Sequence, residues 1–474
     1  MRICMVAEGC YPYVVGGVSS WIHSMIKAFP QHEFVILAIV ADRSYRHRFV
    51  YDLPDNVSGV YEVYLNDLDW YSKKRRGKPR LSKGERAALR SLIFNEDVDW
   101  DTVFDIFQHK DLSINDLLMG EFFLRCVVDY YDENYPEIVF SDFLWTMRSM
   151  YLPLFLALKS EVPQADLYHC VATGYAGVLG AMAQRKYHCG LLVSEHGIYT
   201  REREEELIKA SWVQGVYKNI WIEQFYKMSQ LAYDRADVVT SLYQGAHRLQ
   251  IELGCPEEKA IVTPNGVDMS HFEDIPQKTE EDRQFVNVGA VIRVAPIKDV
   301  KTLIAAFSFA RKQVLNLRLW IMGPYEEERK YADECFEMVR SMGLEDEVVF
   351  TGRVDVTRYL GRMDFTILTS ISEGQPLTVL ESFSAKRPVI ATDVGCCREL
   401  LYGNDDGIGP AGILCHVMGV DEIADAMVTL AEHPQMRHDM AANGYERAKR
   451  FYRLDQMKET YRGLYDAFEQ GEAR

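Results

Sequence analysis

The sequence lacks an excess of positive charge, a long apolar run and a regular cysteine pattern. Its 53 lysine and arginine residues are outnumbered by 70 acidic residues, which gives a net charge of −17 and argues against nucleic acid as the main partner. The longest apolar stretches, 34–41 and 150–158, are much shorter than the roughly 20 residues of a membrane-spanning helix. Because the chain as a whole is acidic, an anionic ligand would need a local cluster of basic residues.

The ten cysteines are scattered along the chain, and the adjacent pair Cys396-Cys397 has neither zinc-ligand nor redox spacing. We therefore expect reduced thiols, no metal and a cytoplasmic location. The first seven residues form a short apolar run that ends at Glu8, and we do not expect this run to be a leader peptide.

At 474 residues and 48% hydrophobic composition, the chain is too long for a single core. Predicted strands alternate with predicted helices, which indicates an α/β fold with parallel sheets covered on both faces. The predicted first domain covers 1–270, with a largely helical insertion at about 42–165. The second covers 283–450 and is followed by a C-terminal helix at 451–474. The polar stretch 268–284 is the best candidate for a linker.

Glu373 and Glu381 bracket a glycine turn and a predicted helix start. A buried strand is predicted over 365–368, and Pro376 suits the first position of a helix. Glu373 would thus lie at the carboxyl end of the strand, and Glu381 a little over one turn into the helix. Together with free helix amides, the two carboxylates could bind a phosphorylated, hydroxyl-rich ligand. The alternative is a solvated loop charge and an exposed helix residue.

Arg293 and Lys298 follow a strand predicted over 285–291, on a loop that leads into a helix. Two cations at this spacing suit a diphosphate, because arginine binds it bidentately and lysine adds a point charge. Each such charge-assisted bond contributes about 1.5–3 kcal/mol. The alternative is a pair of exposed loop cations.

The first half of the chain offers weaker candidates. Gly16-Gly17 precede a predicted helix, where they either let the backbone approach a ligand or form a plain turn. His196 ends a predicted strand, where an α/β enzyme exposes reactive groups, although a structural histidine is an alternative. Asp97 and Asp99 have the spacing of some metal sites, but we interpret them as solvated acids. The basic run 73–76 is interpreted as a solvated patch, with an acidic or membrane-headgroup contact as the alternative.

Four matches, taken in order, resemble a known family, the retaining glycosyltransferases of family four. They are Gly16-Gly17, His196, the Arg293 and Lys298 pair, and the E-x7-E formed by Glu373 and Glu381. Members of this family have the GT-B fold, with two facing Rossmann-like domains. Further stretches resemble the Pel-type members, which act in exopolysaccharide synthesis: 8–13, 16–21, 168–169, 173–177, 195–203 and 264–268. The resemblance covers nearly the whole chain and is weakest over 42–165.

The resemblance implies a UDP-sugar donor, with UDP-glucose suggested, that is bound mainly by the second domain and closed over by the first. It further implies that the anomeric configuration is retained and that neither a cofactor nor a metal is needed. A growing saccharide is the implied acceptor. Inner-membrane polysaccharide synthase and transport proteins are the implied partners, through which the chain would be peripheral to the membrane.

The resemblance also gives each candidate residue a role. Arg293 and Lys298 would neutralise the leaving diphosphate, with help from the Gly17 amide. Glu381 would bind the ribose hydroxyls, Glu373 the donor sugar, and His196 the reacting region of that sugar. The donor-binding set is completed by Gly16, Gly374, Leu377 and Thr378.

Two features depart from the pattern of the family. Pro296 stiffens the loop between the two cations, and the segment 290–292 precedes Arg293 where many relatives have glycine and arginine. Other functions with the same fold stay open: a UDP-sugar epimerase, a pyridoxal-dependent phosphorylase, or a non-catalytic UDP-sugar-binding scaffold of a membrane synthase.

Overall fold

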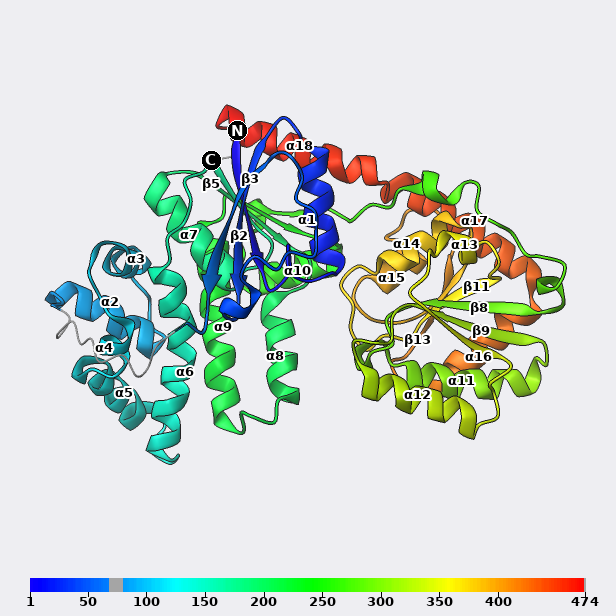
Figure 1. Ribbon diagram of the computed structural model, residues 1–474, viewed down its shortest axis with the longest axis horizontal. Helices are drawn as coiled ribbons and strands as arrows, with labels where there is room; N and C mark the ends of the chain where they lie inside the picture. Colours follow the sequence, from blue (N-terminus) through cyan, green and yellow to red (C-terminus); the bar gives the residue numbers. More distant parts are fainter. Residues whose placement is uncertain (68–79, 473–474) are drawn as a thin grey trace. The chain divides into compact units, whose positions relative to one another are not determined.

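Two parallel sheets organise the chain, which a computed structural model describes over residues 1–67 and 80–472 (Figure 1). The first unit contains 1–241, 247–261 and 462–474, and the second contains 242–246 and 262–461. Each unit has its own hydrophobic core. The basic run 73–76 lies outside the described residues.

The sheet of the first unit has the strand order β3-β2-β1-β4-β5-β6-β7 over the described residues. Its strands are β1 (Arg2–Glu8), β2 (Glu33–Val40), β3 (Val57–Tyr64), β4 (Leu167–Cys170), β5 (Gly190–Glu195), β6 (Val238–Ser241) and β7 (Ala260–Val262). The interior residues 3–7 of β1 are all buried, as expected for a parallel strand covered on both faces. The order reverses between β1 and β4, so the loops that follow these two strands diverge at this point of the sheet.

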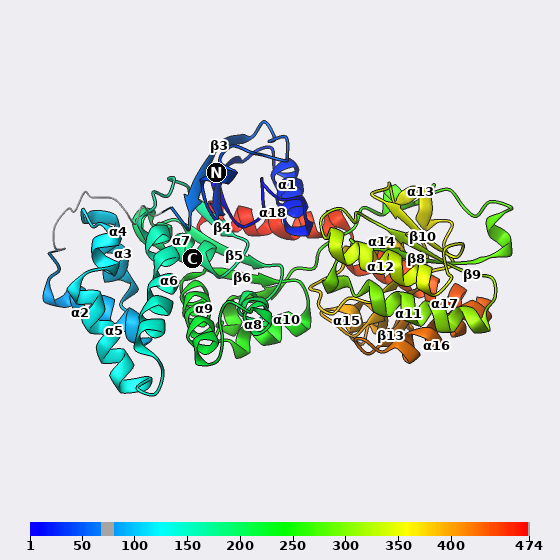
Figure 2. The ribbon, with the colours of Figure 1, turned by 60° about the horizontal axis from the view of Figure 1, so that its bottom comes forward.

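The helices of the first unit are α1 (Gly17–Ala28), α2 (Lys83–Phe94), α3 (Trp100–His109), α4 (Ile114–Leu118), α5 (Glu121–Asn134), α6 (Phe140–Lys159), α7 (Tyr175–Tyr187), α8 (Tyr199–Lys209) and α9 (Val216–Arg235). The insertion is formed by α2–α6. Figures 1 and 2 show α2–α5 gathered on the side of α6 that faces away from the sheet. Insertion and sheet share one hydrophobic core.

The stretch 42–165, predicted as a largely helical insertion, also contains the strand β3. This strand lies at the edge of the sheet and pairs in parallel with β2. Only Val63 is buried within it, while its other residues are half-buried or exposed. An edge strand with so little buried surface gives a weak apolar pattern in the sequence.

The sheet of the second unit has the order β10-β9-β8-β11-β12-β13. Its strands are β8 (Val286–Val291), β9 (Leu317–Met322), β10 (Val348–Gly352), β11 (Phe365–Leu368), β12 (Val389–Thr392) and β13 (Gly412–Cys415). The order reverses between the parallel neighbours β8 and β11. Open α/β sheets bind ligands at such a reversal, beyond the carboxyl ends of the strands. The sequence predicted all of these strands except β13, which has only four residues.

The second unit begins with 242–246, which include the first residues, 244–246, of α10 (Gln244–Glu252); the rest of α10 belongs to the first unit. The second unit ends within α18 (Leu454–Gln470), whose residues from 462 onward belong to the first unit. Its other helices are α11 (Val300–Gln313), α12 (Arg329–Ser341), α13 (Thr357–Leu360), α14 (Leu377–Ser384), α15 (Cys397–Tyr402), α16 (Val420–Glu432) and α17 (Pro434–Phe451). None of the helices over 1–67 and 80–472 is both long and apolar enough to cross a membrane.

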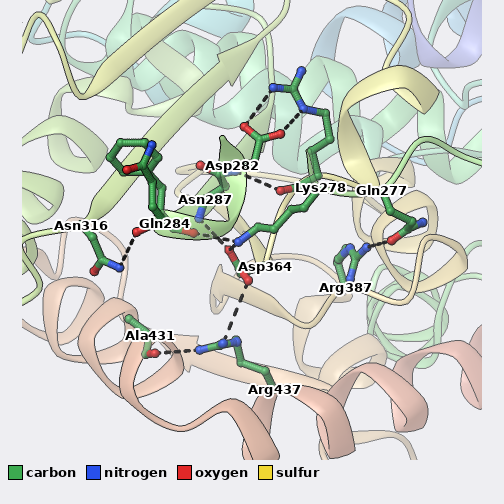
Figure 3. A network of polar contacts seen from close by, with 12 residues as sticks. Gln277, Lys278, Asp282, Gln284, Asn287, Asn316, Asp364, Arg387, Ala431 and Arg437 are labelled. Carbon is green, nitrogen blue, oxygen red and sulfur yellow. Dashed lines mark hydrogen bonds and ion pairs between the residues drawn. The ribbon is translucent and has the colours of Figure 1, made fainter. Parts of the chain in front are cut away.

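The predicted linker 268–284 belongs to the second unit and is held in it by ion pairs and hydrogen bonds of buried and half-buried charges (Figure 3). The Asp364 carboxylate, directly before β11, accepts from Lys278 Nζ at 2.5 Å and from the Asn287 amide at 2.7 Å. Asp282 accepts two bonds from the guanidinium of Arg362, at 2.8 and 3.0 Å, and these bonds lower the pKa of Asp282 to about 2. The charges that suggested a linker therefore fix this segment in place.

The two ends of the chain are connected within the first unit. The sequence placed a separate C-terminal helix at 451–474, whereas the structure assigns the last residues, from 462 onward, to the first unit. Tyr465 Oη on α18 hydrogen-bonds Nδ1 of the buried His169 on β4 at 2.9 Å. Since a tyrosine needs a partner for its hydroxyl when buried, this bond fixes the end of the helix against the sheet.

Candidate functional site

The strongest cluster of predicted residues lies beyond β8 and β11, where the strand order reverses. Lys298, on the loop after β8, forms an ion pair with Glu373, on the loop after β11. Their side chains are 19% and 12% exposed, so the pair is largely shielded from water. Ser370 Oγ donates to the same carboxylate oxygen, Oε1, at 2.5 Å. Oε2 has no partner among the described residues, and the Lys298 ammonium has further protons to donate.

Backbone contacts hold these two loops against each other. Thr369 Oγ1 donates to the Lys298 carbonyl oxygen at 2.9 Å, and the Ile371 amide donates to the Ile297 carbonyl oxygen at 2.9 Å. Asp299 adopts a left-handed backbone conformation, with φ of 46°, and its carboxylate caps α11 by accepting from the Thr302 amide. The position of Lys298 is therefore set by the loop that carries Glu373.

A third loop, after β12, packs on the Glu373 segment. Gly395 has a φ of +54°, and a Cβ at this position would lie 2.2 Å from the Glu373 carbonyl oxygen and 2.3 Å from that of Gly374. The Cys396 amide donates to the Gly374 carbonyl oxygen at 3.0 Å. A side chain at 395 would thus push the motif out of place. Gly395 was not among the predicted site residues; its position after a predicted strand is the signal that the sequence offers for it.

Arg293 lies away from the Lys298 pair and is exposed. Its guanidinium bonds the Glu327 carboxylate at 2.9 Å, and the two side chains are 55% and 50% exposed. The loop around it continues the strand contacts, since the Ile292 and Val294 amides bond carbonyl oxygens at 322 and 324. The structure thus does not join the two predicted cations into one contact; instead, each cation has its own carboxylate partner.

The second predicted carboxylate, Glu381, differs from the first. It lies in the second turn of α14, which begins at Leu377 after the cap residue Pro376, one position later than predicted. The described residues give its carboxylate neither a hydrogen bond nor an ion pair, and burial raises its pKa. No side chain caps α14, so the amides of Leu377 and Thr378 face no competing side-chain acceptor.

The candidates of the first unit lie beyond β1 and β5. Gly16 has an extended backbone that any residue can adopt, and a Cβ at Gly16 or Gly17 would meet no atom within 4 Å. The fold itself therefore does not require glycine at either position. No side chain caps α1, which leaves its first amides without a side-chain acceptor.

His196 follows β5 and packs against Trp21 of α1, with ring centroids 4.4 Å apart. Its Nε2 atom is buried and has no hydrogen-bond partner among the described residues. Burial lowers the pKa of His196 to about 4, so the imidazole is neutral near pH 7. The ring is thus held with an uncharged, unpaired nitrogen, which a purely structural histidine does not need.

The residue before His196 explains how it is positioned. Glu195 is 2% exposed, and burial raises the pKa of its carboxyl group. The carboxylate accepts hydrogen bonds from Thr173 Oγ1 (3.0 Å), the Tyr199 amide (3.2 Å), Tyr233 Oη (2.7 Å) and Gln250 Nε2 (2.9 Å). This network fixes the end of β5. Glu195 could not be singled out from the sequence, because its hydrogen-bond partners are far apart in the chain.

The two predicted solvated acids remain on the surface, and one has a structural role. Asp99 caps α3 by accepting from the Thr102 amide at 3.0 Å and from its hydroxyl at 2.6 Å. Asp97 is exposed. Over 1–67 and 80–472, no three histidine, cysteine or acidic side chains form a group that could hold a metal ion.

Comparisons with known proteins divide the chain in the same two parts. Residues 1–258 match a family described as "Domain of unknown function (DUF3492)", and residues 282–433 match the family "Glycosyl transferases group 1". The second match contains Arg293, Lys298, Glu373 and Glu381. Over 282–433, the match to group 1 glycosyl transferases supports the predicted resemblance.

The curated relatives match in part. D-inositol 3-phosphate glycosyltransferase of Kribbella flavida is 28% identical over 44% of this chain and 50% of its own. Alpha-monoglucosyldiacylglycerol synthase of Streptococcus pneumoniae is 27% identical over 28% of this chain and 32% of its own. The chain thus spans half or less of the length of these relatives.

Solved structures match over nearly the whole chain. Anabaena HepE, solved with UDP and glucose, has a TM-score of 0.59 and 16% identity over 98% of this chain and 100% of its own. Sucrose-phosphate synthase of Thermosynechococcus elongatus has a TM-score of 0.63 and 14% identity over 99% of each chain. These likenesses confirm the predicted GT-B fold of two Rossmann-like domains.

Proposed function

The chain belongs to the family described as a domain of unknown function (DUF3492), and we propose that it is a glycosyltransferase with a UDP-sugar donor. The observation that carries the proposal is the pair of Lys298 and Glu373 beyond β8 and β11, with the unpaired carboxylate of Glu381 on the adjacent α14. The match to group 1 glycosyl transferases over 282–433 supports it. The HepE structure, solved with UDP and glucose, supports a UDP-sugar as donor.

In this proposal the groups beyond β8 and β11 divide the donor between them. Lys298 donates to the diphosphate with protons that Glu373 does not use, and Glu373 Oε2 accepts from a sugar hydroxyl. Glu381 accepts from the ribose, a role that suits a carboxylate without another partner. Arg293 joins the diphosphate by leaving the exposed Glu327. Negative charge develops on the leaving phosphate in the transition state, so fixed cations accelerate its departure.

The residues of the first unit have proposed roles of their own. The amides that follow Gly16, with no side-chain cap in competition, donate to a phosphate oxygen. His196, neutral and with a free Nε2, hydrogen-bonds the reacting sugar. A charged imidazole there would repel the positive charge that develops on the sugar ring in the transition state.

The finer proposal names the reaction more closely. We propose a retaining hexosyl transfer without metal or cofactor, from UDP-glucose to a growing saccharide. The stretches that resemble the Pel-type family members point to PelF, the glycosyltransferase of Pel exopolysaccharide synthesis in biofilms, and to inner-membrane synthase and transport proteins as partners.

The test combines donor binding with turnover. Thermal shift with a panel of nucleotide sugars identifies the donor, because a ligand stabilises the state that binds it. We expect UDP affinity, measured by calorimetry, to fall about tenfold or more in Arg293→Ala and in Glu381→Ala. Arg450→Ala, which removes an exposed arginine of α17, is the matched control and should bind normally. Unchanged affinity in both site variants would overturn the proposal.

Turnover separates the alternatives. UDP release that depends on a saccharide acceptor supports transfer, and His196→Ala should lose this transfer while keeping its UDP affinity. A new UDP-sugar formed without acceptor would identify an epimerase instead. Tight UDP-sugar binding without turnover, even with the membrane partners present, would identify a scaffold.

A further inference from the structure

A buried arginine in the helical insertion has no acidic partner among the described residues. Arg148 lies on α6 and is 8% exposed. Its Nε donates to the carbonyl oxygen of Leu118, at the end of α4, at 3.2 Å. Nothing else in the described part of the chain forms an ion pair or hydrogen bond with its guanidinium, and burial lowers its pKa. A buried cation without a counter-ion costs folding free energy, and the binding of an anionic ligand would explain why the chain keeps it.

Arg148 also lines a cavity of about 450 Å³. This volume lies within the range of small-molecule sites. The wall combines apolar groups, neutral polar groups and one cation, Arg148: Leu65, Asn66, Trp145, Arg148, Ser149, Leu152 and Pro153. Four of these residues, 145, 148, 149 and 152, follow the spacing of one helix face. The cavity thus lies between the end of β3 and one face of α6.

Trp145 adds a flat surface beside the charge. It is 55% exposed, and the Arg148 Cζ atom lies 5.1 Å from the centroid of its ring. An exposed tryptophan next to a buried guanidinium offers stacking and charge at one place. Asn66 and Ser149 can hydrogen-bond a ligand but carry no charge, so Arg148 is the residue that selects the sign of the ligand.

We propose that this Arg148 cavity binds a small organic anion, with a phosphate or carboxylate group attached to a planar or apolar body. The anionic group accepts a bidentate pair of bonds from the two terminal guanidinium nitrogens, and the body lies along Trp145 and Leu152. None of the predicted donor-site residues lines the cavity. The site is therefore additional to the proposed UDP-sugar site and does not depend on it.

Phenyl phosphate is the probe, because it joins both features in one small molecule. The full chain is labelled with 5-fluorotryptophan, and the Trp145 fluorine resonance is identified by its absence from Trp145→Phe. We expect a saturable shift of this resonance with a Kd of about 1 mM. Phenol and inorganic phosphate each have only one of the two features, so their affinity should be lower by at least about tenfold.

The variants test the charge. Arg148→Met keeps an unbranched apolar stem but removes the guanidinium and its charge, and it should weaken phenyl phosphate binding at least about tenfold. Arg125→Met, on the neighbouring α5, removes an exposed arginine and should bind as the unmodified chain does. The proposal is overturned if the Trp145 resonance does not move up to about 20 mM phenyl phosphate, or if Arg148→Met binds equally well. If Arg148→Met does not fold, equal binding of phenol and phenyl phosphate to the unmodified chain also overturns it.

Discussion

Replacing Lys298 by methionine tests whether the ion pair with Glu373 serves both the fold and the reaction. The change leaves a carboxylate that is 12% exposed with only the Ser370 hydroxyl as a partner. Breaking a buried pair costs about 3–5 kcal/mol, and the lower value applies because the Lys298 side chain is 19% exposed. For a unit of this size, about 3 kcal/mol lowers Tm by roughly 6–12 °C.

A double variant separates charge from packing. In Lys298→Met/Glu373→Gln no unpaired charge is left, so we expect at least half of the lost Tm to return. Turnover should stay about 10²–10³ lower in both variants, because the cation and the carboxylate are missing from the transition state. Thermal unfolding and acceptor-dependent UDP release are the two measurements.

The neighbouring Lys301 is the matched control for this experiment. It pairs with Glu334 at 2.6 Å, but both side chains are more than 40% exposed. Exposed pairs contribute at most about 1 kcal/mol, so Lys301→Met should change Tm by no more than about 4 °C. If the double variant is as unstable as Lys298→Met, the unpaired charge is not the cause of the loss. Normal turnover in Lys298→Met would remove the residue from the proposed mechanism.

Three further predictions follow from buried groups. The pKa of Glu381 is raised in the fold, so its protonated carboxyl group stabilises the chain below about pH 4.5, and this stability is lost as the pH rises. In thermal unfolding, Glu381→Gln should be more stable than the unmodified chain at pH 7.5 but not at pH 4. The pKa of His196 is lowered from 6.5 to about 4, so stability is lost as pH falls across this window, and His196→Gln should unfold with a weaker pH dependence there. Arg447 is 1% exposed and pairs with Asp406 at 2.6 Å. Arg447→Met should therefore lower the free energy of unfolding, measured in urea, by about 3–5 kcal/mol, whereas Arg450→Met should leave it unchanged.

Much of the second unit could be predicted because a parallel strand buried on both faces is a continuous apolar run, and the residues after such a run lie at the ligand-binding edge. This reasoning placed Lys298 and Glu373 at the ends of two strands. Their neighbourhood needs the sheet order, because β8 and β11 are separated by more than 70 residues and become adjacent only through the reversal. The contact of Gly395 with the Glu373 segment could not be predicted for the same reason, because it depends on the pairing of β11 with β12.

Glycines illustrate a second limit of the sequence. Gly16-Gly17 attracted attention as a doublet, yet a side chain at either position would meet only open space. The single Gly395, in contrast, is required by the fold, since it has a positive φ and lies against the Glu373 carbonyl oxygen. A doublet before a helix therefore points to a ligand more than to a turn, whereas a lone glycine after a strand can be a steric requirement.

The two carboxylates of the E-x7-E motif are alike in the sequence but differ in their physical situation. Glu373 is satisfied by an ammonium and a hydroxyl, so its burial is compensated within the fold. Glu381 is half-buried and has no hydrogen-bond or ion-pair partner among the described residues, and the buried guanidinium of Arg148 in the other unit has no acidic partner among them. A charged group of this kind lowers stability in the absence of a partner, and natural chains keep such groups where function needs them. Stability that rises on neutralising Glu381, together with weaker UDP binding, would identify this carboxylate as a binding group rather than a structural one.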